Sequence, residues 1–519
     1  MMRARAEAFE VSAKDGERAT ATTGARAFVL DTAIVAAAQL LLKLRGLVAI
    51  PLIVKVLGTA EYGVWVQTLA LVDFSSSVFG ANLHHPLVRF LSESPERGRK
   101  IYGTLLAATV ATGVVGGLLF FASAEQLSRF ALGDAGHAWE VRAGGLLLLC
   151  YNVRLFNLNA YRALGRMKER AAFELLSTFG MLAGMSVLLL AGYKLPGVFV
   201  FMGAWEAAFA VALCAHVGRI VGVGGFDGGL LKDALRYALP LLPAGLSIWI
   251  LDRSDRLVIG HFMGPESVGV YSANYALAGL LMLFQTPLQV TLLPKVSSLW
   301  NADRATAVRY VSLSNKLFLT FAIPFVVGAP VVARPLLARL GNEQIGAGGG
   351  VLTFLIAAGV LMWGVSIMLT QVFYGARKTM PVGVVTVAAA LLNLLLNFLL
   401  VPAWGVAGAA AATLVSYAAS CAALYALSLK IARLDFHAPR LVKCAAASLA
   451  MWVVLRAVVG VSERPLALAS AIVAGVATYF ASLWLLKAFE PSEFEFLKGL
   501  FTRRAPEVER RAVASAVER

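Results

Sequence analysis

Two basic residues stand near the middle of the first long apolar run of the chain. The run FVLDTAIVAAAQLLLKLRGLVAIPLIV, residues 28–54, contains Lys43 and Arg45. A cation deep in a membrane helix costs at least about 2.5–3.5 kcal/mol, so it generally faces water, a partner or a ligand. The two side chains point to nearly opposite sides of the helix. Arg45, whose guanidinium fork suits a diphosphate, is predicted to line a wet, cationic cavity. The alternative is a structural ion pair with an acid on a neighbouring helix.

A second charged group lies in the apolar segment 234–260, which carries Asp252, Arg253, Asp255 and Arg256. Asp252 and Arg256 are four residues apart with the acid first, an order that favours an ion pair on a helix surface. Arg253 has no such neighbour, so it is the second candidate for substrate contact. Anchoring of Arg253 at the membrane interface is the alternative.

Other apolar segments also carry isolated charges. Asp73, Glu206 and Arg154 are the main cases, and the two acids are candidate proton or cation sites, or counter-ions to the arginines. The candidate substrate-binding residues are therefore Arg45, Arg253, Lys43, Arg256 and Arg154, and the candidate ion-coupling residues are Asp73, Glu206, Asp252 and Asp255.

The composition is that of a polytopic membrane protein. Of 519 residues, 59% are hydrophobic and 15% are charged, and a soluble protein cannot hide so much apolar surface. The net charge of +16 fits basic cytoplasmic loops and does not imply nucleic acid. The four cysteines show no paired spacing, so neither a disulfide framework nor a metal site is predicted. We find no ATP-binding glycine-rich loop and no nucleophile motif, and therefore expect no enzyme activity and no cofactor.

Apolar run length predicts an all-α protein with about 14 transmembrane helices. Loops on one side of these helices hold about 20 Lys and Arg residues against about 8 on the other, which places both termini in the cytoplasm. The expected spans are 28–54, 62–87, 101–124, 142–161, 171–192, 196–218, 234–260, 268–294, 310–333, 349–373, 381–401, 405–429, 440–461 and 466–488.

An internal repeat relates the two halves of the chain. LGTAEYGVW from residue 57 parallels MGPESVGVY from residue 263, a shift of 206 that aligns Gly58 with Gly264 and Gly63 with Gly269. The same shift aligns two prolines, Pro196 and Pro402. Six helices per unit is an even number, so the halves share one orientation and the substrate is expected between them. The predicted domains are a tail 1–26, six-helix bundles 27–222 and 223–432, two further helices in 433–489, and a tail 490–519, both tails being cytoplasmic.

Three motifs resemble those of a known superfamily. They are VLGTAEYGVW from residue 56, YGARKTMP from residue 374 and NLLLNFLLVPAWGVAGAAAATLVSY from residue 393. Together they resemble the polysaccharide-transporter (Wzx-like) branch of the multidrug/oligosaccharidyl-lipid/polysaccharide exporter superfamily, over residues 27–430. The resemblance implies two pseudo-symmetric six-helix bundles around a V-shaped central cavity that alternates access, here with two more helices at the C-terminus.

The resemblance also implies a function. A flippase of this branch moves undecaprenyl-diphosphate-linked oligosaccharide across the bacterial inner membrane, for lipopolysaccharide, exopolysaccharide or another surface polysaccharide. Membrane lipid is then a partner, and polysaccharide polymerase and glycosyltransferases act in the same pathway. Cationic cavity residues engage the anionic substrate in such flippases, and by position Arg45 and Arg253 are the candidates.

Three alternatives stay open at this point. A peptidoglycan lipid-precursor flippase would share the fold and the charge. An ion-coupled multidrug antiporter of the same superfamily would carry an acid within its first helix, where this chain has only Asp31 at the start. A membrane-embedded glycosyltransferase or polymerase would need a large extracytoplasmic loop, whereas the longest one expected, near 125–141, is short.

Overall fold

The structure is a computed structural model that describes residues 38, 41–42, 44–461 and 465–488. Helices make up nearly all of this part of the chain, and it contains no β-strand, as the sequence predicted. Lys43 lies outside the described residues. We refer below to residues 44–221 as the first half and to residues 228–428 as the second half.

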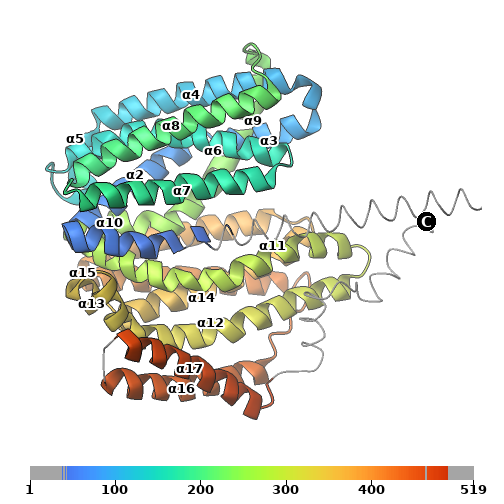
Figure 1. Cartoon of the computed structure of the whole chain (residues 1–519). Helices are drawn as coiled ribbons and strands as arrows, with labels where there is room; N and C mark the ends of the chain where they lie inside the picture. Colours follow the sequence, from blue (N-terminus) through green and yellow to red (C-terminus); the bar gives the residue numbers. More distant parts are fainter. Residues whose placement is uncertain (1–37, 39–40, 43, 462–464, 489–519) are drawn as a thin grey trace, which may run out of the picture.

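The first half is a set of long helices that gather in one part of the molecule, coloured blue to green in Figure 1. Residues 44–57 form the opening helix. It is followed by α2 (Thr59–Phe79), α3 (His84–Glu93), α4 (Gly98–Ala122), α5 (Ala124–Leu132), α6 (Ala138–Ala163), α7 (Met167–Leu190) and α8 (Leu195–Val221).

The second half repeats this plan with longer continuous helices, and two further helices lie beyond it. Its elements are α9 (Gly228–Ala238), α10 (Leu242–Ala278), α11 (Met282–Leu299), α12 (Arg304–Leu340), α13 (Glu343–Ala347), α14 (Val351–Gly375) and α15 (Met380–Ser428). The further pair, α16 (Ala438–Val461) and α17 (Pro465–Leu485), packs against α12 at the outer edge of the molecule (Figure 1).

Two of the longest helices each contain two spans, because a glycine breaks them. Gly264 in α10 has φ 79° and Gly405 in α15 has φ 60°, a left-handed conformation that suits glycine. Within the described residues, nine helices are long and apolar enough to cross a membrane, or ten when the bent pair α2 and α3 counts as one. Dividing α10 and α15 at these glycines and adding α6 and helix 44–57 gives the fourteen predicted spans.

The sequence repeat appears in the structure first as two glycines with matching backbone conformations. Gly58 has φ 97° and ψ 174°, and its counterpart Gly264 has φ 79° and ψ 175°. Both glycines connect two successive spans. The two prolines that the repeat aligns agree less well in structure, because Pro196 lies in the first turn of α8 whereas Pro402 precedes the break in α15.

The helices that follow these glycines cross at the paired positions of the repeat. A Cβ on Gly63 would lie 1.7 Å from the carbonyl oxygen of Pro265, and a Cβ on Gly269 would lie 2.5 Å from that of Thr59. Thr59 and Pro265 are themselves 206 residues apart, so the two contacts are equivalent. The halves therefore meet most closely at this end of the molecule, where only glycine allows the backbones to approach.

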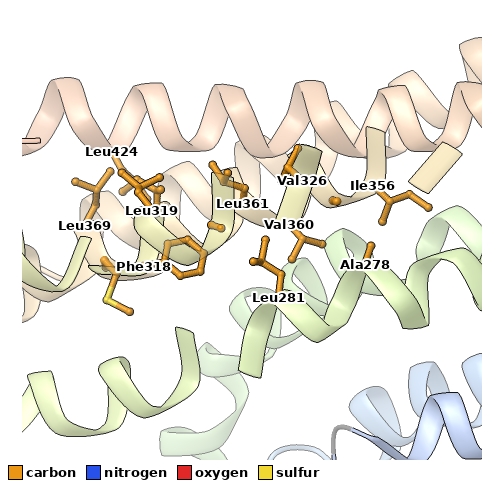
Figure 2. Close-up of a cluster of buried hydrophobic side chains, with 14 of the residues drawn as sticks. Ala278, Leu281, Phe318, Leu319, Val326, Ile356, Val360, Leu361, Leu369 and Leu424 are labelled. Carbon is orange, nitrogen blue, oxygen red and sulfur yellow. The ribbon is translucent and has the colours of Figure 1, made fainter. Parts of the chain in front are cut away.

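One large hydrophobic cluster lies in the second half, a second joins the first half to Ala273, Leu337 and Ile345 of the second half, and a smaller one lies between α12 and the last two helices. Figure 2 shows part of the second-half core, in which Phe318 of α12 packs among side chains of α14, with Ala278 and Leu281 nearby. The last pair of helices closes on α12: Met451 and Leu455 cover Gly328, and the Tyr479 hydroxyl donates to the Thr320 carbonyl at 2.6 Å. The last two helices are thus fixed to the second half.

Side-chain caps begin two helices that follow loops. The Asp227 carboxylate accepts from the Leu230 amide at 3.1 Å, and the Asp303 carboxylate accepts from the Thr306 amide at 3.0 Å. Both aspartates are at N-cap positions, where the amides of the first turn need an acceptor. These hydrogen bonds, from the Leu230 amide and from the Thr306 hydroxyl and amide, lower the pKa of each carboxyl.

Candidate functional site

A cavity of about 300 Å³ lies between the two halves. The first half contributes side chains of α2, α4 and α6, and the second half contributes α10. It lies toward the end of α2 that is opposite the Gly63 crossing. The lining residues are Asp73, Ser76, Ser77, Gly80, Asn82, Leu83, His84, Thr109, Tyr151, Asn152, Leu155, Phe156, Gly245, Ile248, Trp249, Asp252 and Arg253.

Helical periodicity explains why these residues share the cavity. On α10 the lining residues recur at intervals of three and four, which places them on one helix face: Gly245, Ile248, Trp249, Asp252 and Arg253. The lining residues of α2 follow the same spacing from Asp73 to Gly80. One face of α2 and one face of α10 therefore line the cavity, and both faces contain polar residues.

Arg253 forms an ion pair across the cavity. Its Nη1 lies 2.7 Å from Asp73 Oδ2, and its Nε lies 3.4 Å from Asp252 Oδ2. The Arg253 side chain is 31% exposed and that of Asp73 is 25% exposed. The sequence left Arg253 without a neighbour on its own helix face, and the partner proves to be an acid from the other half. Apart from His84, the lining residues carry one guanidinium and two carboxylates.

Arg45 is exposed on helix 44–57 and has no ion pair within the described part of the chain. It does not itself line the cavity, but its charge reaches a residue that does. Four charged side chains act electrostatically on the Tyr151 hydroxyl: Asp73, Arg154, Arg45 and Arg253. Tyr151 therefore marks the region where these candidate residues come together.

Arg154 and Glu206 form a buried pair in the first half. Arg154 Nε donates to Glu206 Oε2 at 2.7 Å, and their side chains are 13% and 5% exposed. The guanidinium also stacks over Tyr151, 5.1 Å from the ring centroid. Both acids that the sequence singled out in the first half, Asp73 and Glu206, thus act as counter-ions to arginines in this structure.

Asp255 and Arg256 lie in the interior of the second half, away from the cavity lining. The Asp255 carboxylate accepts from Arg256 Nη1 at 3.1 Å and from the Tyr271 hydroxyl at 2.5 Å. Arg256 also donates to the backbone carbonyl of Asp252 at 2.6 Å and lies over the Tyr275 ring, 4.4 Å from its centroid. Arg256 thus forms an ion pair with Asp255, and its hydrogen bond to Asp252 goes to the backbone carbonyl rather than to the carboxylate that the spacing indicated.

Sequence reasoning missed part of the cavity wall. Trp249 and Ser76 line it, and the Ser76 hydroxyl donates at 2.6 Å to Oδ1 of Asn152, a polar residue beside Arg154 that also lines the cavity. The signal was present, since Trp249 precedes Arg253 by four residues. A tryptophan in an apolar segment, however, gives no sign of whether it faces lipid or a cavity.

Two relatives with partial sequence identity are described as probable flippases. The chain is 24% identical over 379 residues to the probable flippase AglR of Haloferax volcanii, which covers 70% of this chain and 75% of that protein. It is 25% identical over 166 residues to the probable low-salt glycan biosynthesis flippase Agl15 of the same organism, covering 32% of this chain and 35% of that one.

Solved transporters share the fold. The lipid II flippase MurJ, in an inward closed conformation, superposes with a TM-score of 0.74 at 14% identity, over 87% of this chain and 98% of that chain. An inward-facing multidrug resistance MATE family transporter of the MOP superfamily gives a TM-score of 0.63 at 14% identity, over 75% of this chain and 94% of that one.

Two family models match the sequence. The model described as lipid II flippase MurJ matches residues 245–489, and the model described as polysaccharide biosynthesis protein matches residues 52–344. The second match spans more than half of the chain. The chain therefore belongs to the polysaccharide biosynthesis protein family.

Proposed function

We propose that this protein flips an undecaprenyl-diphosphate-linked oligosaccharide across the bacterial inner membrane for the synthesis of a surface polysaccharide. The observation that carries the proposal is the cavity between the halves, with Arg253 in its wall, together with the exposed Arg45 on helix 44–57. The family and its flippase relatives support transport rather than catalysis.

The charges suit such a substrate. A lipid diphosphate is costly to move through hydrocarbon unless cations compensate its charge. Arg45 provides a cation that no carboxylate of the described residues neutralises, whereas the charge of Arg253 at the cavity wall is compensated by Asp73. Charge-assisted bidentate hydrogen bonds from guanidinium groups are well matched to phosphate oxygens. The lipid tail stays in the bilayer while the head group enters.

We infer alternating access, and the contacts between the halves at one end of the molecule support it. At the Gly63 end, Asn342 Nδ2 donates to the Thr59 hydroxyl at 2.9 Å, and His261 Nδ1 lies 2.9 Å from the Phe130 carbonyl oxygen. The cavity lies toward the other end, which the loop charges assign to the cytoplasm. We therefore assign the structure to a state that is closed on the extracytoplasmic side, from which one half rocks against the other.

Ion coupling is proposed for an acid at the cavity. Of the four candidates, Asp73 forms an ion pair between the halves, with Arg253 of the other half. Protonation of Asp73 or cation binding to it would release this contact between the halves. Glu206 and Asp255 instead pair within one half, which suits a structural role.

A second candidate function is the flipping of a peptidoglycan lipid precursor. The match of the second half and the last two helices to the lipid II flippase model favours it. Both candidates need the same cationic contacts, and they differ in the sugar that the lipid carries.

Deletion of the gene tests the proposal directly. We expect lipid-linked oligosaccharide to accumulate in the inner leaflet while cell-surface polysaccharide is lost, because synthesis continues without translocation. Cell lysis with a build-up of peptidoglycan precursor would instead favour the second candidate. Normal surface polysaccharide and normal lipid pools would contradict both. Expression of the gene in trans is the control.

A further inference from the structure

The cavity wall is poorly suited to the diphosphate itself. Arg253 already faces two carboxylates, with Asp73 at 2.7 Å and Asp252 at 3.4 Å, so the charged pair and the second acid leave a net negative wall. A diphosphate in direct contact with this wall would be repelled by both acids. The part of the substrate that fits here is neutral or positively charged.

Two buried N–H donors in this wall have no partner in the described chain. They are Trp249 Nε1 and Asn152 Nδ2, on side chains that are only 8% and 4% exposed. A buried polar group without a hydrogen bond is unfavourable, and an oxygen-bearing ligand that displaces no existing bond would satisfy it. Both residues line the cavity, but the two nitrogen atoms are themselves covered, so a ligand reaches them only after these side chains turn.

The remaining groups complement sugar hydroxyls. A hydroxyl both donates and accepts, so it pairs with an N–H group and a carboxylate placed close together. The wall provides carboxylates from Asp73 and Asp252 beside the two donors. Aromatic rings of Tyr151 and Trp249 add flat apolar surface, and Phe74 of the other half packs on the Trp249 ring at a centroid distance of 4.8 Å.

The volume of the cavity limits the size of the ligand that it can bind. About 300 Å³ is at the small end of the range of about 300–1,000 Å³ that is usual for ligand pockets. This space suits a small part of an oligosaccharide and not a whole lipid-linked repeat unit.

We propose that the cavity between α2, α6 and α10 is a saccharide subsite that binds a neutral or amino-bearing sugar ring of the substrate, while Arg45 contacts the diphosphate. This inference rests on the proposed function and makes it more specific, since it predicts discrimination against sugars that carry a carboxylate. Trp249 and Asn152 provide the hydrogen-bond donors, and Asp73 and Asp252 provide the acceptors.

Saturation-transfer NMR on the full-length protein in lipid nanodiscs tests the subsite. The probes are the methyl glycosides of glucose, N-acetylglucosamine, glucosamine and glucuronic acid, each at millimolar concentration. We expect saturation transfer to at least one of the first three, and several-fold weaker transfer to the glucuronide. Binding of none of the first three, or strongest binding of the glucuronide, would overturn the inference.

A pair of matched variants separates the subsite from general effects of losing a tryptophan. Trp249→Phe keeps an aromatic ring but removes the Nε1 donor, and we expect sugar affinity to fall about five- to tenfold. Trp404→Phe, on a residue that is 63% exposed at the outer surface, should bind as the wild type does. Asn152→Asp keeps the oxygen that accepts from Ser76 and should also weaken binding of the neutral sugars. Unchanged affinity in both cavity variants would contradict the subsite.

A second probe keeps this inference distinct from the proposed function. Inorganic pyrophosphate should bind the wild type and Trp249→Phe alike, and should bind Arg45→Ala poorly. Pyrophosphate binding that depends on Arg45, without sugar binding, would refute the subsite and leave the flippase proposal standing. If the wild type binds neither the methyl glycosides nor pyrophosphate, the result would count against the flippase proposal as well.

Discussion

Arg253 of α10 and Asp73 of α2 form an ion pair of 2.7 Å that joins the two halves of the molecule across the cavity. Their positions in the chain are 180 residues apart, on helices of different halves. In the proposed mechanism, this contact changes when one half rocks against the other. Asp73 and Arg253, which the sequence singled out separately, thus form one ion pair between the halves.

The strength of this pair can be measured with a double-mutant cycle. We expect Asp73→Asn and Arg253→Gln to show a coupling energy of about 0.5–1 kcal/mol in denaturant unfolding, because both side chains are partly exposed and water screens them. The exposed pair Arg129 and Glu125, at 67% and 49% side-chain exposure, is the matched control and should couple less. Equal coupling energies for the two pairs would show that the Asp73–Arg253 pair stabilises the contact between the halves no more than an exposed surface pair would.

The buried pair of Arg154 and Glu206 should respond much more strongly. Glu206→Gln leaves the Arg154 guanidinium buried without its counter-ion, which we expect to destabilise the protein by about 3–5 kcal/mol. The double variant Arg154→Met with Glu206→Leu should recover most of this loss, since neither charge is then buried. Thermal unfolding in detergent measures both. A Glu206→Gln variant as stable as the wild type would mean that the pair is not buried in the membrane-embedded protein.

The glycine crossing gives a prediction in which the usual sign is reversed. Alanine in place of a helical glycine ordinarily stabilises by up to about 1 kcal/mol. Gly383→Ala, where no atom lies within 4 Å of the new Cβ, should follow this rule. Gly63→Ala would place the Cβ 1.7 Å from the Pro265 carbonyl oxygen, so we expect about 1–3 kcal/mol of destabilisation of this state.

Thiol labelling shows which state the glycine variant adopts. Thr59 is only 3% exposed beside the crossing, so Thr59→Cys in a background without the four native cysteines should label slowly. Adding Gly63→Ala should raise the labelling rate several-fold, because the helices cannot approach. Adding Gly383→Ala should leave it unchanged. Slow labelling in all three proteins would contradict a closed end at Gly63.

Much of the fold could be predicted from the sequence, for physical reasons that particular residues make clear. Membrane spans are apolar over a length that the bilayer fixes, so the helices were visible as runs. The repeat was visible because Gly58 and Gly264 meet the same backbone demand, a positive φ, and few other residues accept it. The all-α fold with about 14 transmembrane helices is confirmed, although most of residues 28–43 of the first predicted span lie outside the described residues.

The site was less predictable. The sequence identified Arg253 and Asp73 as unusual charges but not as partners, because a contact between distant helices depends on packing that no local pattern records. Arg256 bonds to Asp255 as well as to Asp252, since burial brings the adjacent carboxylate within reach. The roles of the candidate substrate-binding and ion-coupling residues, and the limits of the predicted domains, stay predictions.

The most direct test of the central claim is the rate at which Arg45→Ala flips lipid-linked oligosaccharide in proteoliposomes. Lys55→Ala is the matched control, since Lys55 is an exposed cation on the same helix. We expect the Lys55 variant to flip at the wild-type rate and the Arg45 variant to lose at least about tenfold, the effect of one lost charge-assisted contact. A wild-type rate in Arg45→Ala would contradict a cationic contact with the diphosphate during flipping.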